Sequence, residues 1–202
     1  KLARKSKRIH AHEFPVYVSA MMLAGCMMVL RFMILILIFS TSIFLNIYPY
    51  LLIMSATAAG IGIFIHKKHT IKGEREVIEE TETESNPLEF KVALIFALLF
   101  VVFTFLTHYT LVYAGTGGLS ILSIATGLSD ITPFILNLLQ GGNIPATIVG
   151  ACIMQAIISN IVVNMFYAIF FSSRRKEMLP YVWKGFLTVI GVNAVLLLIY
   201  YF

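Results

Sequence analysis

Long apolar runs are the feature of this sequence that most constrains its fold. Several of them exceed the roughly 20 residues that an α-helix needs to cross the hydrocarbon core of a bilayer. Open sheets are excluded at that depth, because lipid offers no partner to unpaired backbone groups. Hydrophobic residues make up 59% of the 202 residues, and charged residues 12%. The sequence predicts an all-α polytopic membrane protein with about five full transmembrane helices and one broken or re-entrant helical hairpin.

The predicted organisation follows the alternation of apolar and charged segments. In order, the parts are a basic arm (1–14), a first transmembrane helix pair (15–66), a charged linker (67–89) and a second transmembrane unit (90–202). The expected spans are 15–39, 47–65, 88–113, 144–171 and 178–202, with a turn at 40–46 and the broken helix at 119–140.

Basic clusters set the expected orientation. They are the N-terminal arm, Lys67 with Lys68, and the run 174–176, and they account for much of the formal charge of +5. Such clusters stay on the cytoplasmic side and attract anionic lipid. We therefore expect a multi-pass protein of the cell (inner or plasma) membrane with a cytoplasmic N-terminal arm. The arm has no interleaved aromatic residues, so we expect no nucleic-acid partner.

Metal and cofactor chemistry has little support in the sequence. The glutamates of the linker could form a divalent-cation sensor, but their spacing matches no calcium loop, and a solvated linker is the simpler interpretation. Cys26 and Cys152 lie in apolar runs, which fits small core residues rather than a disulfide or a Cys-rich metal site. We expect no cofactor, and the sequence leaves any metal undetermined.

The stretch TGLSDITP (126–133) interrupts an apolar run with groups that a lipid-facing helix would not carry at mid-length. Ser129 or Asp130 can cap a new helix starting at Ile131, and Pro133 is tolerated in its first turn. Asp130 is a functional-site candidate, because an ionisable group within a bilayer needs a partner, water or an ion. The alternative is a plain loop between two short interfacial helices.

The number of membrane crossings between the basic clusters favours a re-entrant hairpin. If all three basic clusters are cytoplasmic, the helix that ends near residue 171 must start on the outside, where the chain already lies at Gly115. Residues 119–140 must then enter and leave on the same face, with the tip at 127–130. Non-helical backbone within the membrane is tolerated only where protein buries it or water reaches it.

Other polar residues fall inside the predicted spans. Arg31 lies deep in the first span and should face the bundle and need a partner, and we expect that partner to be Asp130. His108 shares a helix face with Thr104 and Thr107, and it either binds a proton or metal or simply hydrogen-bonds a neighbouring helix.

A polar stripe marks the span 144–171. It contains the i, i+4 pairs Gln155 with Ser159 and Asn160 with Asn164. Interhelical hydrogen bonds or a water-filled pathway would each explain the stripe. The candidate ion or substrate pathway comprises Gly127, Ser129, Asp130, Thr132, Gln155, Asn160, Asn164, Arg31 and His108.

Two further patterns concern packing. Small residues at i and i+4, Ser55 with Ala59 and Ala56 with Gly60, predict close helix approach. The segments AGCMM (24–28) and GACIM (150–154) form a faint internal repeat. In the predicted topology the two copies cross the membrane in opposite directions, so the repeat is inverted. Inverted repeats with broken helices place sites near the midplane of transporters.

The motifs NPLEFK (86–91), GLSD (127–130) and Ser159-Asn160, in this order, resemble the membrane domain of unknown function 4010, which follows the MgtC domain in long MgtC/SapB-type proteins. The resemblance covers essentially the whole chain. It implies a preceding MgtC domain, with residues 2–5 (LARK) as the tail of an earlier re-entrant hairpin. Arg31 matches the family's basic position. Thr132 stands where a second acid is expected and Asn164 where lysine is expected, which weakens any divalent-ion site.

The resemblance implies a link to magnesium-limitation physiology without an accepted transport activity. Our first hypothesis is a transport- or channel-like module for a small ion or solute, and the alternative is a non-transporting regulatory module that binds another membrane protein. No constellation of catalytic residues supports an enzyme. The chain begins at Lys1 rather than methionine, so we expect a preceding N-terminal domain. The other expected partners are the bilayer and further copies of the chain in a homo-oligomer.

Overall fold

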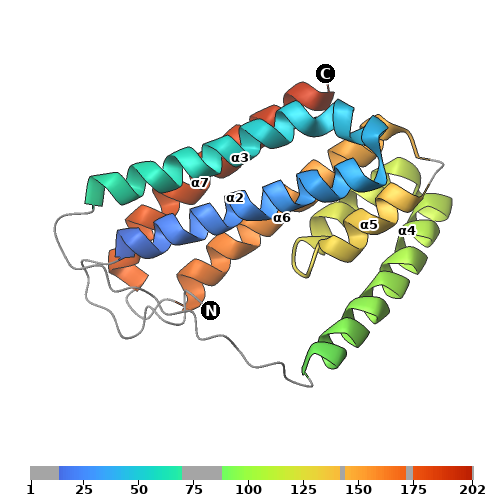
Figure 1. The fold of residues 1–202 in the computed structure, drawn as a ribbon, viewed down its shortest axis with the longest axis horizontal. Helices are drawn as coiled ribbons and strands as arrows, with labels where there is room; N and C mark the ends of the chain where they lie inside the picture. Colours follow the sequence, from blue (N-terminus) through green and yellow to red (C-terminus); the bar gives the residue numbers. More distant parts are fainter. Residues whose placement is uncertain (1–13, 70–87, 142–143, 172–174, 202) are drawn as a thin grey trace.

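Six helices form the part of the chain that the computed structural model describes, which is residues 14–69, 88–141, 144–171 and 175–201 (Figure 1). They are α2 (Phe14–Phe39), α3 (Thr41–His69), α4 (Leu88–Thr126), α5 (Thr132–Gln140), α6 (Ala146–Phe171) and α7 (Arg175–Tyr201). The described residues contain no strand, and five of these helices are long and apolar enough to cross a membrane. The predicted all-α fold with about five spans is confirmed, and the chain is a multi-pass membrane protein.

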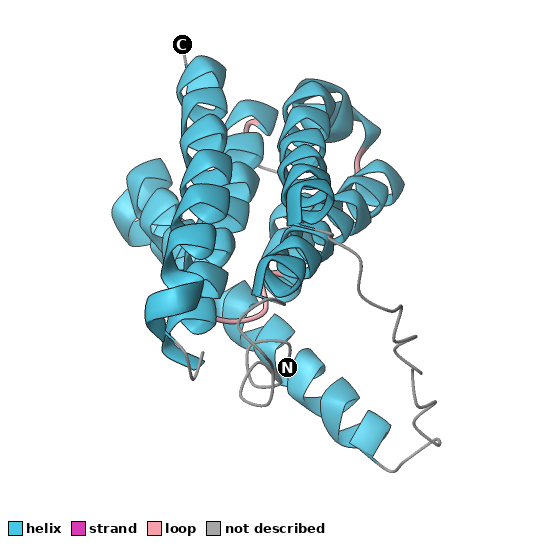
Figure 2. Cartoon of the chain, turned by 90° about the vertical axis from the view of Figure 1, so that its left-hand side faces the viewer, coloured by secondary structure: helices cyan, strands magenta, loops and turns pink. Residues whose placement is uncertain are grey.

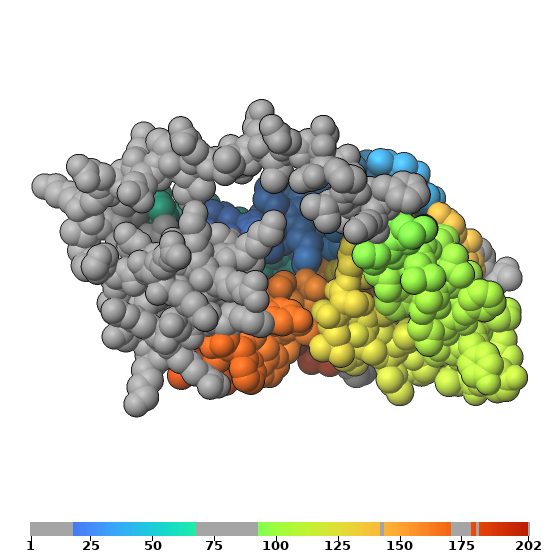
Figure 3. Space-filling model, turned by 90° about the horizontal axis from the view of Figure 1, so that it is seen from below, coloured from blue at the N-terminus to red at the C-terminus, as the bar shows by residue number. Residues whose placement is uncertain are grey.

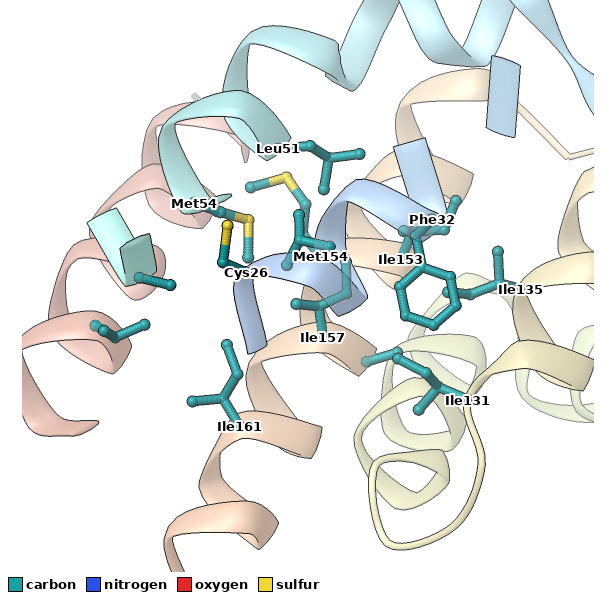
Figure 4. Packing of buried hydrophobic residues seen from close by; sticks show 14 of the residues in the cluster. Cys26, Phe32, Leu51, Met54, Ile131, Ile135, Ile153, Met154, Ile157 and Ile161 are labelled. Atoms are coloured by element: carbon teal, nitrogen blue, oxygen red, sulfur yellow. The ribbon is translucent and has the colours of Figure 1, made fainter. Parts of the chain in front are cut away.

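Helices α2, α3, α6 and α7 lie side by side as an elongated bundle (Figure 1). Helix α2 packs mainly on α3, and α6 mainly on α7, while α3 also contacts α6 and α7. The core between them is apolar, with Leu51 and Met54 of α3 facing Met154 of α6 (Figure 4). Lipid-facing side chains are apolar as well, which is why these helices show no strong polar face.

The turn between α2 and α3 is shorter than the sequence predicts. Helix α3 already begins at Thr41, so the expected turn at 40–46 shrinks to Ser40. The backbone N–H of Ser40 still donates to Ile36, and its side-chain oxygen accepts from the N–H of Ile43 at 3.4 Å. Ser40 thus acts as the N-cap of α3, and no longer loop is needed.

Of the two predicted small-residue faces of α3, only the one that contains Ser55 packs closely against α2. Ser55 is buried and lies 3.2 Å from the sulfur of Cys26, and a Cβ at Gly62 would come within 3.2 Å of Met22. Ala56 and Gly60 are exposed, and Gly60 has no neighbour within 4 Å. The prediction that Ala56 and Gly60 form a packing face is therefore wrong for the described helices.

Helix α4 is bent at Gly115, whose backbone lies at φ 59° and ψ −151°. This left-handed region is open to glycine at little cost, because glycine lacks a Cβ. Before the bend, the start of α4 stands clear of the other helices (Figures 1 and 2). After it, residues 116–126 turn back and pair with α5 as a helical hairpin. We call residues 127–131, which join the two, the elbow.

Candidate functional site

The elbow is a tight turn that ends one helix and starts the next. Three successive backbone N–H groups, at residues 127–129, donate three residues back, which closes the last turn of α4. Helix α5 begins at Thr132, one residue later than predicted, and Pro133 lies in its first turn. Ile131 rather than Ser129 or Asp130 occupies the N-cap position, although the Asp130 carboxylate accepts the N–H of Thr132 at 2.9 Å.

The length of the hairpin sets the depth of the elbow. Residues 116–126 and the nine residues of α5 extend about 16 Å and about 14 Å at 1.5 Å per residue, half of a hydrocarbon core of about 30 Å. The elbow also contacts Ser159, which lies at mid-length of α6. Both ends of the hairpin lie at the same end of the bundle (Figure 1). The predicted break in the helix is present, and its tip lies near the middle of the bundle.

Polar side chains of α6 satisfy backbone carbonyls where α4 ends. Ser159 donates to the carbonyl of Ile124 at 2.6 Å, and Asn160 donates to the carbonyl of Gly127 at 3.3 Å. A Cβ at Gly127 would lie 2.7 Å from the carbonyl carbon of Ser159 and nearer still to its side chain. Glycine at this position therefore allows α6 to reach the broken backbone, whose free carbonyls need partners at membrane depth.

A hydrogen-bonded relay joins the elbow to α2. The guanidinium of Arg31 donates to the hydroxyl of Thr132 at 2.8 Å, and that hydroxyl donates to Asp130 at 2.6 Å. Arg31 is exposed rather than turned into the bundle, and its guanidinium carbon lies 5.1 Å from the centre of the Phe32 ring. The expected direct pair of Arg31 with Asp130 is replaced by a link through Thr132.

The elbow has one buried apolar side and one exposed side that carries Asp130. Ile131 and Ile135 are buried and point toward Phe32 of α2 and Ile153 of α6 (Figure 4). Residues 128–130 are exposed on the other side, and the yellow segment around the elbow reaches the surface between α6 and α4 (Figure 3). Packing against the bundle thus fixes the turn while Asp130 stays accessible.

The remaining stripe residues of α6 are hydrogen-bonded. Gln155 accepts from Ser123 at 2.7 Å and donates to Tyr201 at 3.1 Å, while Asn164 donates to Asn160 at 3.0 Å. Ser129 donates to a carbonyl of α4, that of Thr126, at 3.2 Å. Interhelical and local hydrogen bonds therefore account for the stripe, and only part of it reaches the elbow.

His108 lies apart from the elbow. Together with Thr104 and Thr107 it lines a groove between the first part of α4 and α5, where Asn137 donates to the hydroxyl of Thr104. Of the candidate pathway residues, the structure brings together those of the elbow with Thr132, Arg31, Asn160 and Asn164. It separates Gln155 and His108 from them.

Sequence reasoning missed several polar groups that the fold uses. Ser123 lies in an apolar run, is buried and donates to Gln155 of α6, and buried Thr126 donates to the carbonyl of Ser123. Asn137, one of the two side-chain amides of α5, is a polar residue in an apolar run and was a detectable signal. Within the described ranges, no three His, Cys, Asp or Glu side chains gather where a metal ion could be held.

The fold and its broken helix can now be compared with known proteins. Residues 1–172 match DUF4010, described as a domain of unknown function. The chain belongs to the DUF4010 family. A protein of Aquifex aeolicus (strain VF5), described as an uncharacterized protein, is 24% identical over 157 residues, which cover 76% of this chain and 65% of that protein. The chain thus spans less than two thirds of this relative's length. No solved structure matches the chain.

Proposed function

We propose that this DUF4010 protein is a transport- or channel-like module for a small ion or solute, with the elbow as its central polar site. Asp130 would bind or pass the permeant species, with Ser129 beside it. Thr132, Arg31 and Asn160 would hold Asp130 in place. The module would be non-enzymatic and would lie in the inner or plasma membrane with its N-terminal arm in the cytoplasm.

One observation carries this proposal. A carboxylate is exposed at the tip of a half-length helical hairpin, at the level of the middle of α6, instead of being buried in an ion pair. Irregular backbone and an ionisable group at such a depth are typical of proteins in which water or a solute reaches the site. The N-terminus of α5 and the guanidinium of Arg31 both place positive charge near Asp130.

A flux assay with two substitutions at Asp130 tests the proposal. Asp130→Asn keeps an oxygen that can accept from Thr132 but removes the charge, whereas Asp130→Ala removes both. Proteoliposomes loaded with dyes for Mg²⁺, Na⁺, K⁺, H⁺ or Cl⁻ should show flux for the native chain. Both variants should lose it. Flux that Asp130→Asn retains in full would mean that Asp130 only shapes the turn.

Sided labelling tests the topology on which the proposal depends. Single cysteines at positions 142 and 173 are introduced with Cys26 and Cys152 replaced by alanine. The proposal expects Gly142→Cys to react only from outside and Ser173→Cys only from inside. Reaction of Gly142→Cys from inside would mean that residues 119–140 span the membrane, and a midplane elbow would be rejected.

A second candidate function is a non-transporting regulatory module that binds another membrane protein. The first part of α4 supports it, because this segment stands clear of the bundle (Figure 2) and its residues Leu94, Leu98 and Phe105 are exposed. The resemblance to MgtC/SapB-type proteins would connect such a module with magnesium homeostasis. Absence of flux for every tested ion, with correct sided labelling, would favour this function.

A further inference from the structure

A groove of about 420 Å³ lies between the first part of α4 and α5, away from the relay at the elbow. Its polar lining comes from Thr104, Thr107, His108 and Asn137, and its apolar lining includes Leu111 and Ile144. Ligand sites for small molecules have this size and this mixture of an apolar wall with a few convergent polar groups.

The hydroxyl of Thr107, a residue of the groove lining, is buried without a hydrogen-bond partner among the described residues. Thr107 is 4% exposed. A buried hydroxyl without a partner is costly, whereas the neighbouring Thr104 hydroxyl is satisfied by its own helix and by Asn137. Thr107 therefore offers an unused hydrogen-bonding group at the wall of the groove.

The charge of the lining narrows the ligand class. None of the described lining residues is Asp, Glu, Lys or Arg. A desolvated ion would find no permanently charged partner there, since His108 is the one described lining residue that can gain a charge, so an uncharged ligand fits better. Hydroxyl, amide and imidazole groups can all donate a hydrogen bond to ester or hydroxyl oxygens.

The position of the groove narrows the class further. It is bordered by Thr116 and Gly141, which lie at the two outer ends of the hairpin. With the elbow near mid-depth, this region lies toward the bilayer surface, level with the glycerol and ester groups of lipids.

We propose that this groove binds the uncharged glycerol-ester end of a membrane amphiphile, such as a monoacylglycerol, with Thr107 as a hydrogen-bonding residue. The site is separate from the elbow and does not depend on transport. The acyl chain would lie along the exposed apolar side chains at the start of α4.

Photoaffinity labelling tests this assignment on the purified full chain in detergent. The probe is monoolein carrying a diazirine at its glycerol end, competed with plain monoolein or with oleoyl lysophosphatidate, which differs by its phosphate. Thr107→Val removes the hydroxyl and keeps the shape. Thr110→Val is the matched control, because Thr110 lies outside the lining and faces Gly118.

We expect competable labelling in residues 104–116 and 137–145, with lysophosphatidate a much weaker competitor. Thr107→Val should need about five- to tenfold more monoolein for half-competition, since one hydrogen bond is lost. Its melting temperature should not fall, because the hydroxyl has no partner to lose among the residues that the structure describes. Equal competition in Thr107→Val and the native chain, equal competition by lysophosphatidate, or labelling confined to other segments would overturn the proposal.

Discussion

The four-helix bundle and the hairpin formed by residues 116–140 use polar residues in opposite ways. In the bundle, most backbone groups are satisfied within continuous helices, and buried Asn193 of α7 has no partner for either side-chain atom among the described residues. At the hairpin the helix is broken, and Ser159 and Asn160 bond to the carbonyls exposed by the break. The comparison teaches that polar side chains contribute to stability in this fold where the backbone is interrupted.

The largest loss of stability is expected from a substitution that breaks the contact between the hairpin and the bundle. Gly127→Ala places a Cβ against the backbone and side chain of Ser159, and should lower the free energy of unfolding by about 3 kcal/mol. Gly25→Ala in α2 is the control, because a Cβ added at Gly25 would meet no atom of another residue's side chain or of another helix within 4 Å. This substitution should leave the stability unchanged or raise it slightly. Thermal unfolding in detergent compares the two. Equal stability of both variants would contradict the contact.

The same substitution in the two regions should have opposite signs. Asn160→Leu strands the carbonyl of Gly127 and should destabilise the protein by about 1–2 kcal/mol, whereas Asn193→Leu removes an unpartnered amide and should stabilise it by about 1 kcal/mol. Urea or heat denaturation measures both. Destabilisation by Asn193→Leu would show that its amide has a partner in the folded protein, and the comparison would fail.

A smaller effect is expected at the relay. Thr132→Val removes the hydroxyl that links Arg31 to Asp130 and should cost about 1 kcal/mol. Thr188→Val is its control, because Thr188 is exposed and bonds only to Lys184 of its own helix. Thermal unfolding of both variants measures the difference, and an equal loss of stability would reject the relay.

The relay also changes what an exchange of the two charges should do. Asp130 accepts the N–H of Thr132, which an arginine there cannot accept. The double change Arg31→Asp with Asp130→Arg should therefore fail to restore the stability that either single change removes. Restoration to within about 0.5 kcal/mol in a double-mutant cycle would favour a direct ion pair instead.

The smallest change in stability is expected at Asn164, and it tests whether this residue belongs to the site. Asn164→Leu removes only a donor to Asn160, which keeps its bond to Gly127, so the change should stay within about 0.5 kcal/mol. The same unfolding measurement applies. A loss of stability as large as that caused by Asn160→Leu would show that the site extends one helical turn further, to Asn164.

The features of the fold that could be predicted from the sequence are those that the lipid environment requires. Apolar length marks each spanning helix, and Gly127 with Pro133 marks the break, because both features are local in sequence. The third span was predicted to end at residue 113, but the helix continues to Thr126 and bends at Gly115, where glycine allows the positive φ. Element bounds shifted by a few residues where a cap, such as Ser40, was not recognised.

Partner choice could not be predicted, because it depends on three-dimensional register. The sequence indicates that Arg31 needs a partner, but whether its guanidinium meets Asp130 or Thr132 depends on how α5 rotates against α2. Likewise, Ser55 and Gly60 look equivalent as small residues, yet only Ser55 faces a neighbouring helix. The groove at Thr107 involves residues about thirty positions apart and leaves no local signal.

Short helix α5 is tethered on both sides. Thr132 near its start is bonded to Arg31 of α2, and Asn137 one turn later is bonded to Thr104 of α4. Any sliding of α5 along its axis must break one of these bonds or carry α2 or α4 with it. Whatever occupies the groove and whatever occupies the elbow therefore act on the same mechanical element, and each would alter the affinity for the other by an equal factor.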